Sequence, residues 1–308
     1  MKKKIKTTRL LIFIWIVQGV LHCSAQHTVL YYPTEISQTS INQFYQNPSS
    51  CDTSYKFVFD SFSKVYLGPF ANNNYTFANF NYRINSQSES KFQYLGALFS
   101  YDKEGSFLHK YRFYVNYSYN IHLNQSWVTG FGARIGGFSY RIGKDDYPIG
   151  GNDNALDAAL GIHLKNKSFD LGVSLFQIPQ SKLQPFVEIT KLAQYISVQS
   201  SYTKNLNHYL KNVSNLNINF YQQKTPSVSL ISGIIINDQI NLTAIYRLKK
   251  SIGFMFGLEN IKIGNDHFKL YVSYDIQTNR SIKSNSVEFS LNYRILNKSK
   301  GYLNHQKL

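Results

Sequence analysis

Apolar and polar residues alternate with a period of two along most of the chain beyond residue 54. Over residues 111–123, Tyr, Phe, Val, Ile and Leu occupy one parity and Arg, Asn, Ser and His the other, with Tyr114 as the interruption. The pattern returns over residues 240–248, 268–276 and 287–295. Because successive side chains of a strand point to opposite faces, it predicts long strands with one apolar and one polar face.

We expect fourteen strands, most of them near the ~9–11 residues that a tilted strand needs to cross a bilayer. They cover residues 55–67, 74–84, 91–101, 108–123, 126–142, 154–164, 168–177, 194–206, 214–223, 227–236, 239–248, 251–260, 267–276 and 286–296. Short turns at 124–125, 165–167 and 237–238 alternate with long connections at 143–153, 178–193 and 277–285. This alternation is typical of outer-membrane barrels, whose periplasmic turns are short and whose extracellular loops are longer.

The predicted fold class is therefore all-β, a transmembrane antiparallel β-barrel of about 14 strands in the cell outer membrane. A soluble β-sandwich also produces alternating strands and is the alternative. Long strands, polar faces rich in Asn and Ser, and 24 Tyr with 22 Phe to supply interfacial girdles favour the barrel.

The start of the chain predicts an exported protein. Five cations precede an apolar run over residues 10–21, and small residues follow at Cys23-Ser24-Ala25. This pattern is typical of a secretory signal peptide over residues 1–25, and the run is short for a spanning helix. Beyond it we expect a polar segment at 26–54, either a periplasmic lead or a plug, then the barrel at 55–296 and a polar tail at 297–308.

Composition offers little evidence for catalysis. The chain carries 33 Lys and Arg against 17 Asp and Glu, a formal charge of +16, without a dense basic helix or nucleic-acid motif. We expect no nucleic acid partner, no catalytic or cofactor-binding residues and no metal site, since the eight His are scattered. The acidic residues near 145–157 lack the ligand spacing of a calcium loop.

Two interpretations remain open for the strand cations, among them Arg134, Arg247 and Arg294. On the inner parity they either create a basic interior that attracts anions, or pair with acids in the lumen and fill space. The glycines of residues 130–137 lie in a strand-like stretch, where glycine more often permits curvature than binds phosphate.

Several segments resemble a known family. They are residues 95–105 (LGALFSYDKEG), 117–124 (YSYNIHLN), 130–136 (GFGARIG), 153–162 (DNALDAALGI) and 169–174 (FDLGVS), together with Asn47-Pro48-Ser49. This pattern of strands, glycines and turns is similar to the PorP/SprF family of type IX secretion outer-membrane proteins of Bacteroidota.

The resemblance implies a non-enzymatic accessory component of type IX secretion. Such proteins support export or surface attachment of a client, often an adhesin with a C-terminal targeting domain, and several are linked to gliding motility. The implied partners are that domain, type IX secretion components and outer-membrane lipid. The alternative is a porin-like or fatty-acid-type transport barrel.

The long connections 143–153 and 178–193 are the candidate contacts with a partner. Tyr147 and Phe186, beside Pro148 and Pro185, are aromatic anchors of the kind that dominate protein interfaces. The alternative interpretation is that they pack these connections onto the rim of the barrel.

Overall fold

The computed structural model describes residues 28–30, 36–50, 52, 54–84, 90–143, 151–185, 189–222, 224–264, 266–278 and 284–296. The signal peptide, the polar tail and Cys51 lie outside these residues. The strands are β1 (Thr28–Leu30), β2 (Tyr55–Tyr66), β3 (Asn74–Ile84), β4 (Lys91–Glu104), β5 (Leu108–His122), β6 (Val128–Ile142), β7 (Gly151–Lys165), β8 (Phe169–Phe176), β9 (Lys182–Leu183), β10 (Thr190–Leu192), β11 (Tyr195–Asn205), β12 (Leu210–Tyr221), β13 (Ser227–Ile236), β14 (Ile240–Arg247), β15 (Ser251–Ile263), β16 (Asp266–Gln277) and β17 (Ser286–Leu296). Two short helices, α2 (Gln43–Gln46) and η1 (Gly68–Phe70), accompany them.

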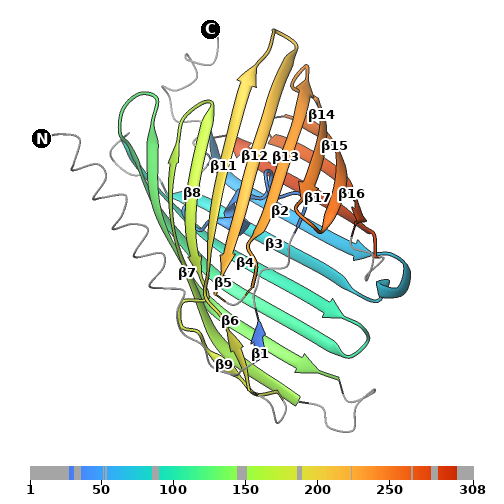
Figure 1. The fold of residues 1–308 in the computed structure, drawn as a ribbon. Helices are drawn as coiled ribbons and strands as arrows, with labels where there is room; N and C mark the ends of the chain where they lie inside the picture. Colours follow the sequence, from blue (N-terminus) through green and yellow to red (C-terminus); the bar gives the residue numbers. More distant parts are fainter. Residues whose placement is uncertain are drawn as a thin grey trace, which may run out of the picture.

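Fourteen antiparallel strands close into one barrel (Figure 1). Each pairs with its neighbours in the sequence, and β17 pairs with β2 to complete the ring. The predicted fold class is confirmed, and every predicted segment corresponds to one barrel strand. A closed barrel excludes the β-sandwich, because the sandwich keeps two separate sheets.

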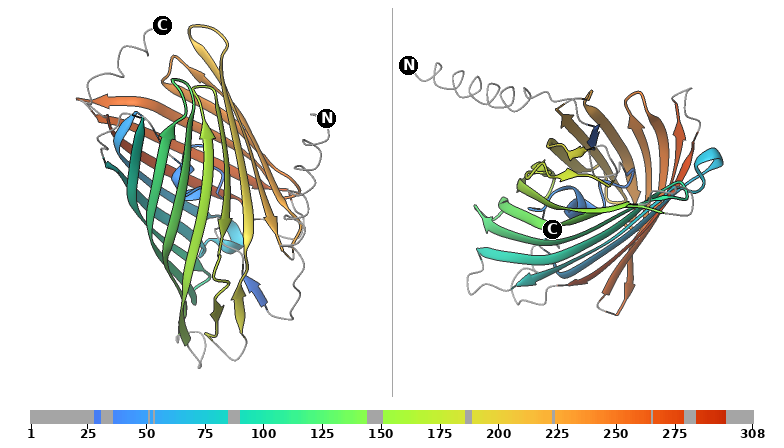
Figure 2. Two further views of the ribbon diagram at one scale, coloured as in Figure 1. Left: turned by 90° about the vertical axis from the view of Figure 1, so that its left-hand side faces the viewer. Right: turned by 90° about the horizontal axis from the view of Figure 1, so that it is seen from below.

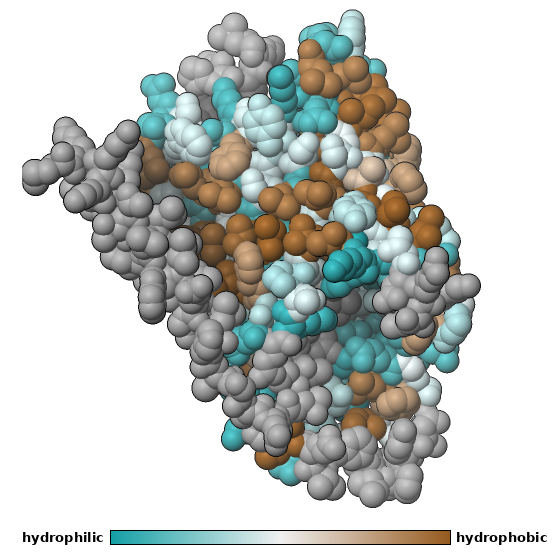
Figure 3. Space-filling model, viewed as in Figure 1, coloured by the Kyte–Doolittle hydropathy of each residue, from teal (hydrophilic) through white to brown (hydrophobic). Residues whose placement is uncertain are grey.

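The outer and inner faces of the wall differ as the alternation predicts. On β5, Phe113 and Val115 are exposed on the outer face, whereas Arg112 and Asn116 are buried in the lumen. Figure 3 shows hydrophobic residues gathered across the middle of one side of the barrel, with hydrophilic residues above and below them. An apolar outer band and a polar interior are the arrangement of a barrel that lies in lipid.

The two ends of the barrel carry different connections. The turns at 85–90, 123–127, 166–168, 206–209, 237–239 and 264–265 lie at one end, here named the short-turn mouth. The connections at 67–73, 105–107, 143–150, 177–194, 222–226, 248–250 and 278–285 lie at the other end, named the long-connection mouth. All three long connections predicted from the sequence therefore share one mouth.

Part of the N-terminal segment lies inside the ring of strands. Figure 2 shows this segment, drawn in blue, surrounded by the barrel wall. Residues 36–50 include the single turn of α2 and are almost all buried. At the long-connection mouth, β1, β10 and β9 form a separate small sheet. Among the described residues, no helix has the length and apolar character to cross a membrane.

Candidate functional site

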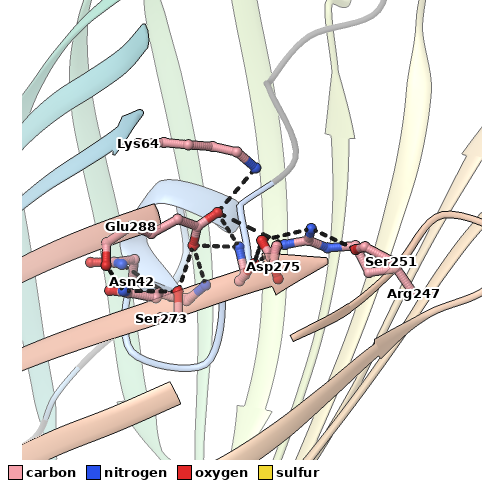
Figure 4. A network of polar contacts seen from close by, with 9 residues as sticks. Asn42, Lys64, Arg247, Ser251, Ser273, Asp275 and Glu288 are labelled. Atoms are coloured by element: carbon pink, nitrogen blue, oxygen red, sulfur yellow. Dashed lines mark hydrogen bonds and ion pairs between the residues drawn. The ribbon is translucent and has the colours of Figure 1, made fainter. Parts of the chain in front are cut away.

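The N-terminal segment is held near the long-connection mouth by a buried network of charged and polar groups (Figure 4). We name it the anchor cluster; its members are Ser37, Gln38, Lys64, Arg247, Ser273, Asp275 and Glu288. The backbone N–H of Ser37 donates to Oε2 of Glu288 at 2.8 Å, and that of Gln38 donates at 3.3 Å. The Ser37 hydroxyl also bonds to Asp275 and Arg247.

Charge balance explains how this cluster tolerates burial. Lys64 Nζ lies 3.1 Å from Glu288 Oε1, and Arg247 Nη1 lies 3.2 Å from Asp275 Oδ2. Glu288 is 0% exposed and Asp275 1% exposed. Two cations thus face two carboxylates, and a buried ion pair persists only when its remaining hydrogen-bonding positions are filled. Ser37 and Gln38 fill some of those positions, so the segment helps to stabilise the buried charges.

Halfway along the lumen, Arg134 of β6 holds the C-terminal end of α2. Its Nη1 donates to the carbonyl oxygen of Tyr45 at 3.0 Å, and its Nη2 donates to that of Phe44. The Nε donates to Oδ1 of Asn116 at 2.7 Å. Because the last carbonyl groups of a helix lack partners within it, a guanidinium group placed there satisfies them.

An aromatic cluster packs around the same turn. The ring of Tyr45 stacks on Phe77 with centroids 4.5 Å apart, and the Tyr75 hydroxyl donates to the Tyr45 hydroxyl at 2.5 Å. Burial raises the pKa of Tyr45 well above its usual value, because the charged phenolate is poorly solvated there. Ile36 and Phe62 belong to the same cluster. This part of the barrel interior is therefore a packed core.

Beyond α2, the turn at Asn47-Pro48-Ser49 lies close against the wall of β6 and β7. A Cβ atom on Gly132 would overlap the backbone of Pro48 and Ser49, and one on Gly161 would overlap the side chain of Asn47. Asn47 Nδ2 donates to the carbonyl oxygen of Ile162 at 3.0 Å. Glycine at these two positions thus permits close approach of the segment, a role that the prediction of strand curvature did not include.

The segment leaves the lumen at the short-turn mouth. Arg294 Nη1 lies 2.6 Å from Asp52 Oδ2, and the Tyr94 hydroxyl donates to the carbonyl oxygen of Tyr55 at 2.7 Å. Arg247 and Arg294 thus pair with lumen acids, as the second of the two interpretations expects, whereas Arg134 bonds to an amide and to carbonyl oxygens. Arg141, by contrast, is exposed on the outer face.

The wall formed by β11, β12 and β13 contacts the segment differently. The part of this wall that lies opposite the segment carries neutral polar side chains, and cavities lie between the two. These cavities are lined by Thr39 and Gln46 on one side and by Asn217 on the other. Asn217 Nδ2 donates to Oε1 of Gln46 at 2.9 Å. The neutral polar residues of this lining include Ser197, Gln199, Ser201, Asn215, Asn217, Asn219 and Ser229.

Of the four predicted partner-contact residues, the structure describes one. Tyr147, Pro148 and Phe186 are outside the described residues, whereas Pro185 is buried. A Cβ on Gly151 would overlap the carbonyl oxygen of Pro185. The backbone of Pro185 therefore lies close against the start of β7.

The connection around Pro185 folds inward over the wall. Leu183 and Leu192 are fully buried against Phe138 and Ala155. The backbone N–H of Ile178 donates to the carbonyl oxygen of Ala158 at 3.1 Å. The connection thus covers the inner surface of β6 and β7 at this mouth instead of extending freely outward.

The anchor cluster was absent from the sequence-based predictions. A signal was available: Lys64, Asp275 and Glu288 are charged residues on the polar parity of strands in a chain of which only 16% is charged. Charges in such strands need partners inside the barrel. Within the described residues, no group of three or more His, Cys, Asp or Glu is placed to hold a metal ion.

The family comparison accounts for the barrel and for the segment inside it. The model of the type IX secretion system membrane protein PorP/SprF matches residues 30–293, which include the segment and all but the last three residues of the barrel. The chain belongs to the PorP/SprF family. It is therefore an outer-membrane component of type IX secretion, and the family points to a non-enzymatic membrane protein associated with secretion components and cargo. No curated protein matches the chain.

Solved barrels share the fold at low sequence identity. The Ralstonia pickettii toluene transporter TbuX is 11% identical, with a TM-score of 0.54 over 82% of this chain and 93% of that one. The CymD monoaromatic hydrocarbon channel is 8% identical, with a TM-score of 0.55 over 86% of this chain and 94% of that one. Likeness at this identity concerns the fold alone.

Proposed function

We propose that this protein supports the export or surface attachment of a secreted, adhesin-type client that carries a C-terminal targeting domain. In a gliding host, we expect the client to serve motility. The protein acts by docking and catalyses no reaction. The observation that carries the proposal is the occupied lumen: residues 36–50 lie in the interior, where Ile36 and Tyr45 pack into an aromatic cluster and Ser37 bonds to buried, ion-paired carboxylates of the wall. A folded client then binds at one mouth of the barrel, because the N-terminal segment occupies the lumen.

The long-connection mouth is the better candidate for that contact. It carries the connections at 143–150 and 177–194, and exposed Lys182 and Gln184 lie beside the buried rim residues. Tyr147 and Phe186 remain our proposed anchors, since large aromatic side chains contribute most to interface energies. Pro148 and Pro185 restrict the backbone beside them.

The test compares two pairs of aromatic positions at opposite mouths. We expect the Tyr147→Ala/Phe186→Ala variant to lose client from the cell surface, measured by mass spectrometry of proteins with a C-terminal targeting domain released by surface proteolysis. The control is Tyr209→Ala, because Tyr209 is 64% exposed at the short-turn mouth. Equal client levels in both variants and the wild type, at equal barrel levels, would reject the proposed anchors.

The second candidate function is a transport barrel. The fold likeness to a toluene transporter and a hydrocarbon channel supports it only at the level of architecture. The two functions differ in expected conductance. A stable, wide pore in wild-type protein would favour transport, whereas a closed lumen favours docking.

A further inference from the structure

The contacts of the N-terminal segment follow one direction through the barrel. Ser37 bonds to Asp275, two residues before β16 ends at the long-connection mouth. Asn47 bonds to the backbone of Ile162, three residues before β7 ends at the short-turn mouth. Asp52 pairs with Arg294 near the end of β17, at the same short-turn mouth. The chain therefore enters the lumen at the long-connection mouth and leaves it at the opposite one.

The first described strand confirms the entry point. Thr28–Leu30 (β1) pairs in parallel with Thr190–Leu192 (β10). β10 belongs to the connection between β8 and β11, which lies at the long-connection mouth. Figure 2, seen from below, shows this small sheet beside the barrel opening. β1, which precedes the lumen segment, thus lies at the long-connection mouth. β17, which closes the barrel, ends at the short-turn mouth.

The small sheet has an unpaired edge. Its order is β1-β10-β9, so within the described part of the chain β1 pairs on one side only. An unpaired edge presents a row of N–H and C=O groups that an extended segment of another protein can pair with. In barrels of this class the mouth with longer loops faces outward.

We infer that β1 forms a recognition edge at the extracellular mouth, onto which an extended acidic segment of the secreted client adds as a strand. The inference deepens the proposed docking function and rests on it for the identity of the partner. The acidic character follows from charge. Among the described residues at this mouth, the exposed cations are Arg141, Lys182, Lys224 and Lys249, while exposed Glu104 is already bonded to Lys110.

The position of β1 is tested by cysteine labelling in whole cells with a membrane-impermeant maleimide, in a Cys51→Ser background. Val29→Cys is compared with Lys224→Cys at the long-connection mouth and with Lys167→Cys at the short-turn mouth, both of which are exposed in the wild type. We expect Val29→Cys and Lys224→Cys to label in intact cells, and Lys167→Cys only after lysis. Labelling of Val29→Cys only after lysis, as expected for Lys167→Cys, would overturn the inference.

The edge itself is tested with purified protein in detergent and a fluorescent peptide of alternating Glu and Val as the probe. Val29→Pro removes one backbone N–H from β1 and disfavours ladder pairing, whereas Val29→Ala keeps the backbone intact. We expect anisotropy titrations to show that Val29→Pro weakens peptide binding about tenfold or more and that Val29→Ala binds like the wild type. A peptide of alternating Lys and Val should bind more weakly to all three.

The outcomes separate this inference from the proposed function. If the acidic peptide does not bind the wild type, or binds Val29→Pro equally well, the recognition edge is wrong. Client attachment that still depends on Tyr147 and Phe186 would then leave the docking function standing.

Discussion

Two walls of the lumen meet the N-terminal segment in different ways. The wall of β14–β17 and β2 supplies the anchor cluster, where Glu288 and Asp275 are buried together with two cations. The wall of β11–β13 presents neutral amides and hydroxyls across cavities, and Asn217 bonds there to Gln46. The same segment is thus fixed by charge on one side and lies beside solvent-sized space on the other.

The difference shows which contacts hold the segment in the lumen. Removing one partner of a buried ion pair leaves an uncompensated charge, whereas a neutral hydrogen bond next to a cavity can be replaced by water. In the described part of the chain, the amide nitrogens of Gln199 and Asn215 have no hydrogen-bond partner, and both face this space. The segment should therefore leave the β11–β13 side more readily than the charged side.

The largest expected effect comes from removing the segment altogether. Deletion of residues 36–50 takes away the buried rings of Phe44 and Tyr45 and the hydrogen bonds from Ser37 to the buried carboxylates, and a barrel of fourteen strands is wider than the eight-stranded barrels that side chains alone fill. We expect large conductance steps in planar bilayers that the wild type lacks. A deletion of residues 301–308 serves as the control. Identical conductance in all three proteins would show that the segment does not close the lumen.

The next effect concerns the anchor cluster. Glu288→Ala leaves Lys64 without its ion-pair partner and removes the acceptor for the backbone of Ser37, so we expect a loss of about 3–5 kcal/mol. Denaturant unfolding in detergent measures this loss, and limited proteolysis measures release of the segment. Glu288→Gln should lose less, because its amide oxygen still accepts hydrogen bonds.

A second carboxylate provides the matched control for that experiment. Glu259 pairs with Lys269 at 2.7 Å and accepts hydrogen bonds from Asn241 and Tyr271, all of them barrel residues. Glu259→Ala should destabilise the barrel while the N-terminal segment stays protected from protease. If both variants release the segment equally, the anchor cluster has no special role in holding it.

A smaller effect is expected where the backbone of the N-terminal segment lies against the backbone of β6. Gly132→Ala places a Cβ against Pro48 and Ser49, and such overpacking costs about 1–3 kcal/mol. Gly137→Ala on the same strand is the control, since its Cβ would meet only the carbonyl oxygen of Ala155 at 4.0 Å. Faster proteolysis of the segment in Gly132→Ala than in Gly137→Ala would support the close approach. Equal rates would contradict it.

The strands could be predicted from the sequence because each is long enough to show its period. Strands β1, β9 and β10 contain three, two and three residues, too few for any period, and all three were missed. The path of the N-terminal segment could not be predicted either. Ser37 and Glu288 are 251 residues apart, and no local pattern links positions so distant. The sequence therefore left open whether residues 26–54 form a lead or a plug.

The connection that carries the candidate contact residues was also predicted only in part from the sequence. The connection 178–193 was recognised by its length and its Pro residues, yet its inward fold depends on Leu183 and Leu192. The apolar residues of this connection, Leu183 and Leu192 among them, were a usable signal, since burying a Leu side chain contributes about 1.5–3 kcal/mol. The surface against which they pack, Phe138 and Ala155, becomes apparent only when β6 and β7 are paired.

The smallest effect is expected on the neutral wall formed by β11, β12 and β13. Asn217→Ala removes the hydrogen bond to Gln46, which is worth about 0.5–1.5 kcal/mol when no polar group is left stranded. Because the adjoining cavity admits water, the Gln46 oxygen regains a partner and the loss should lie near the lower limit. Asn219→Ala, on the same face of β12, is the control. If Asn217→Ala released the segment to protease as fully as Glu288→Ala, the two walls would hold it equally, and charge would not be what keeps it in the lumen.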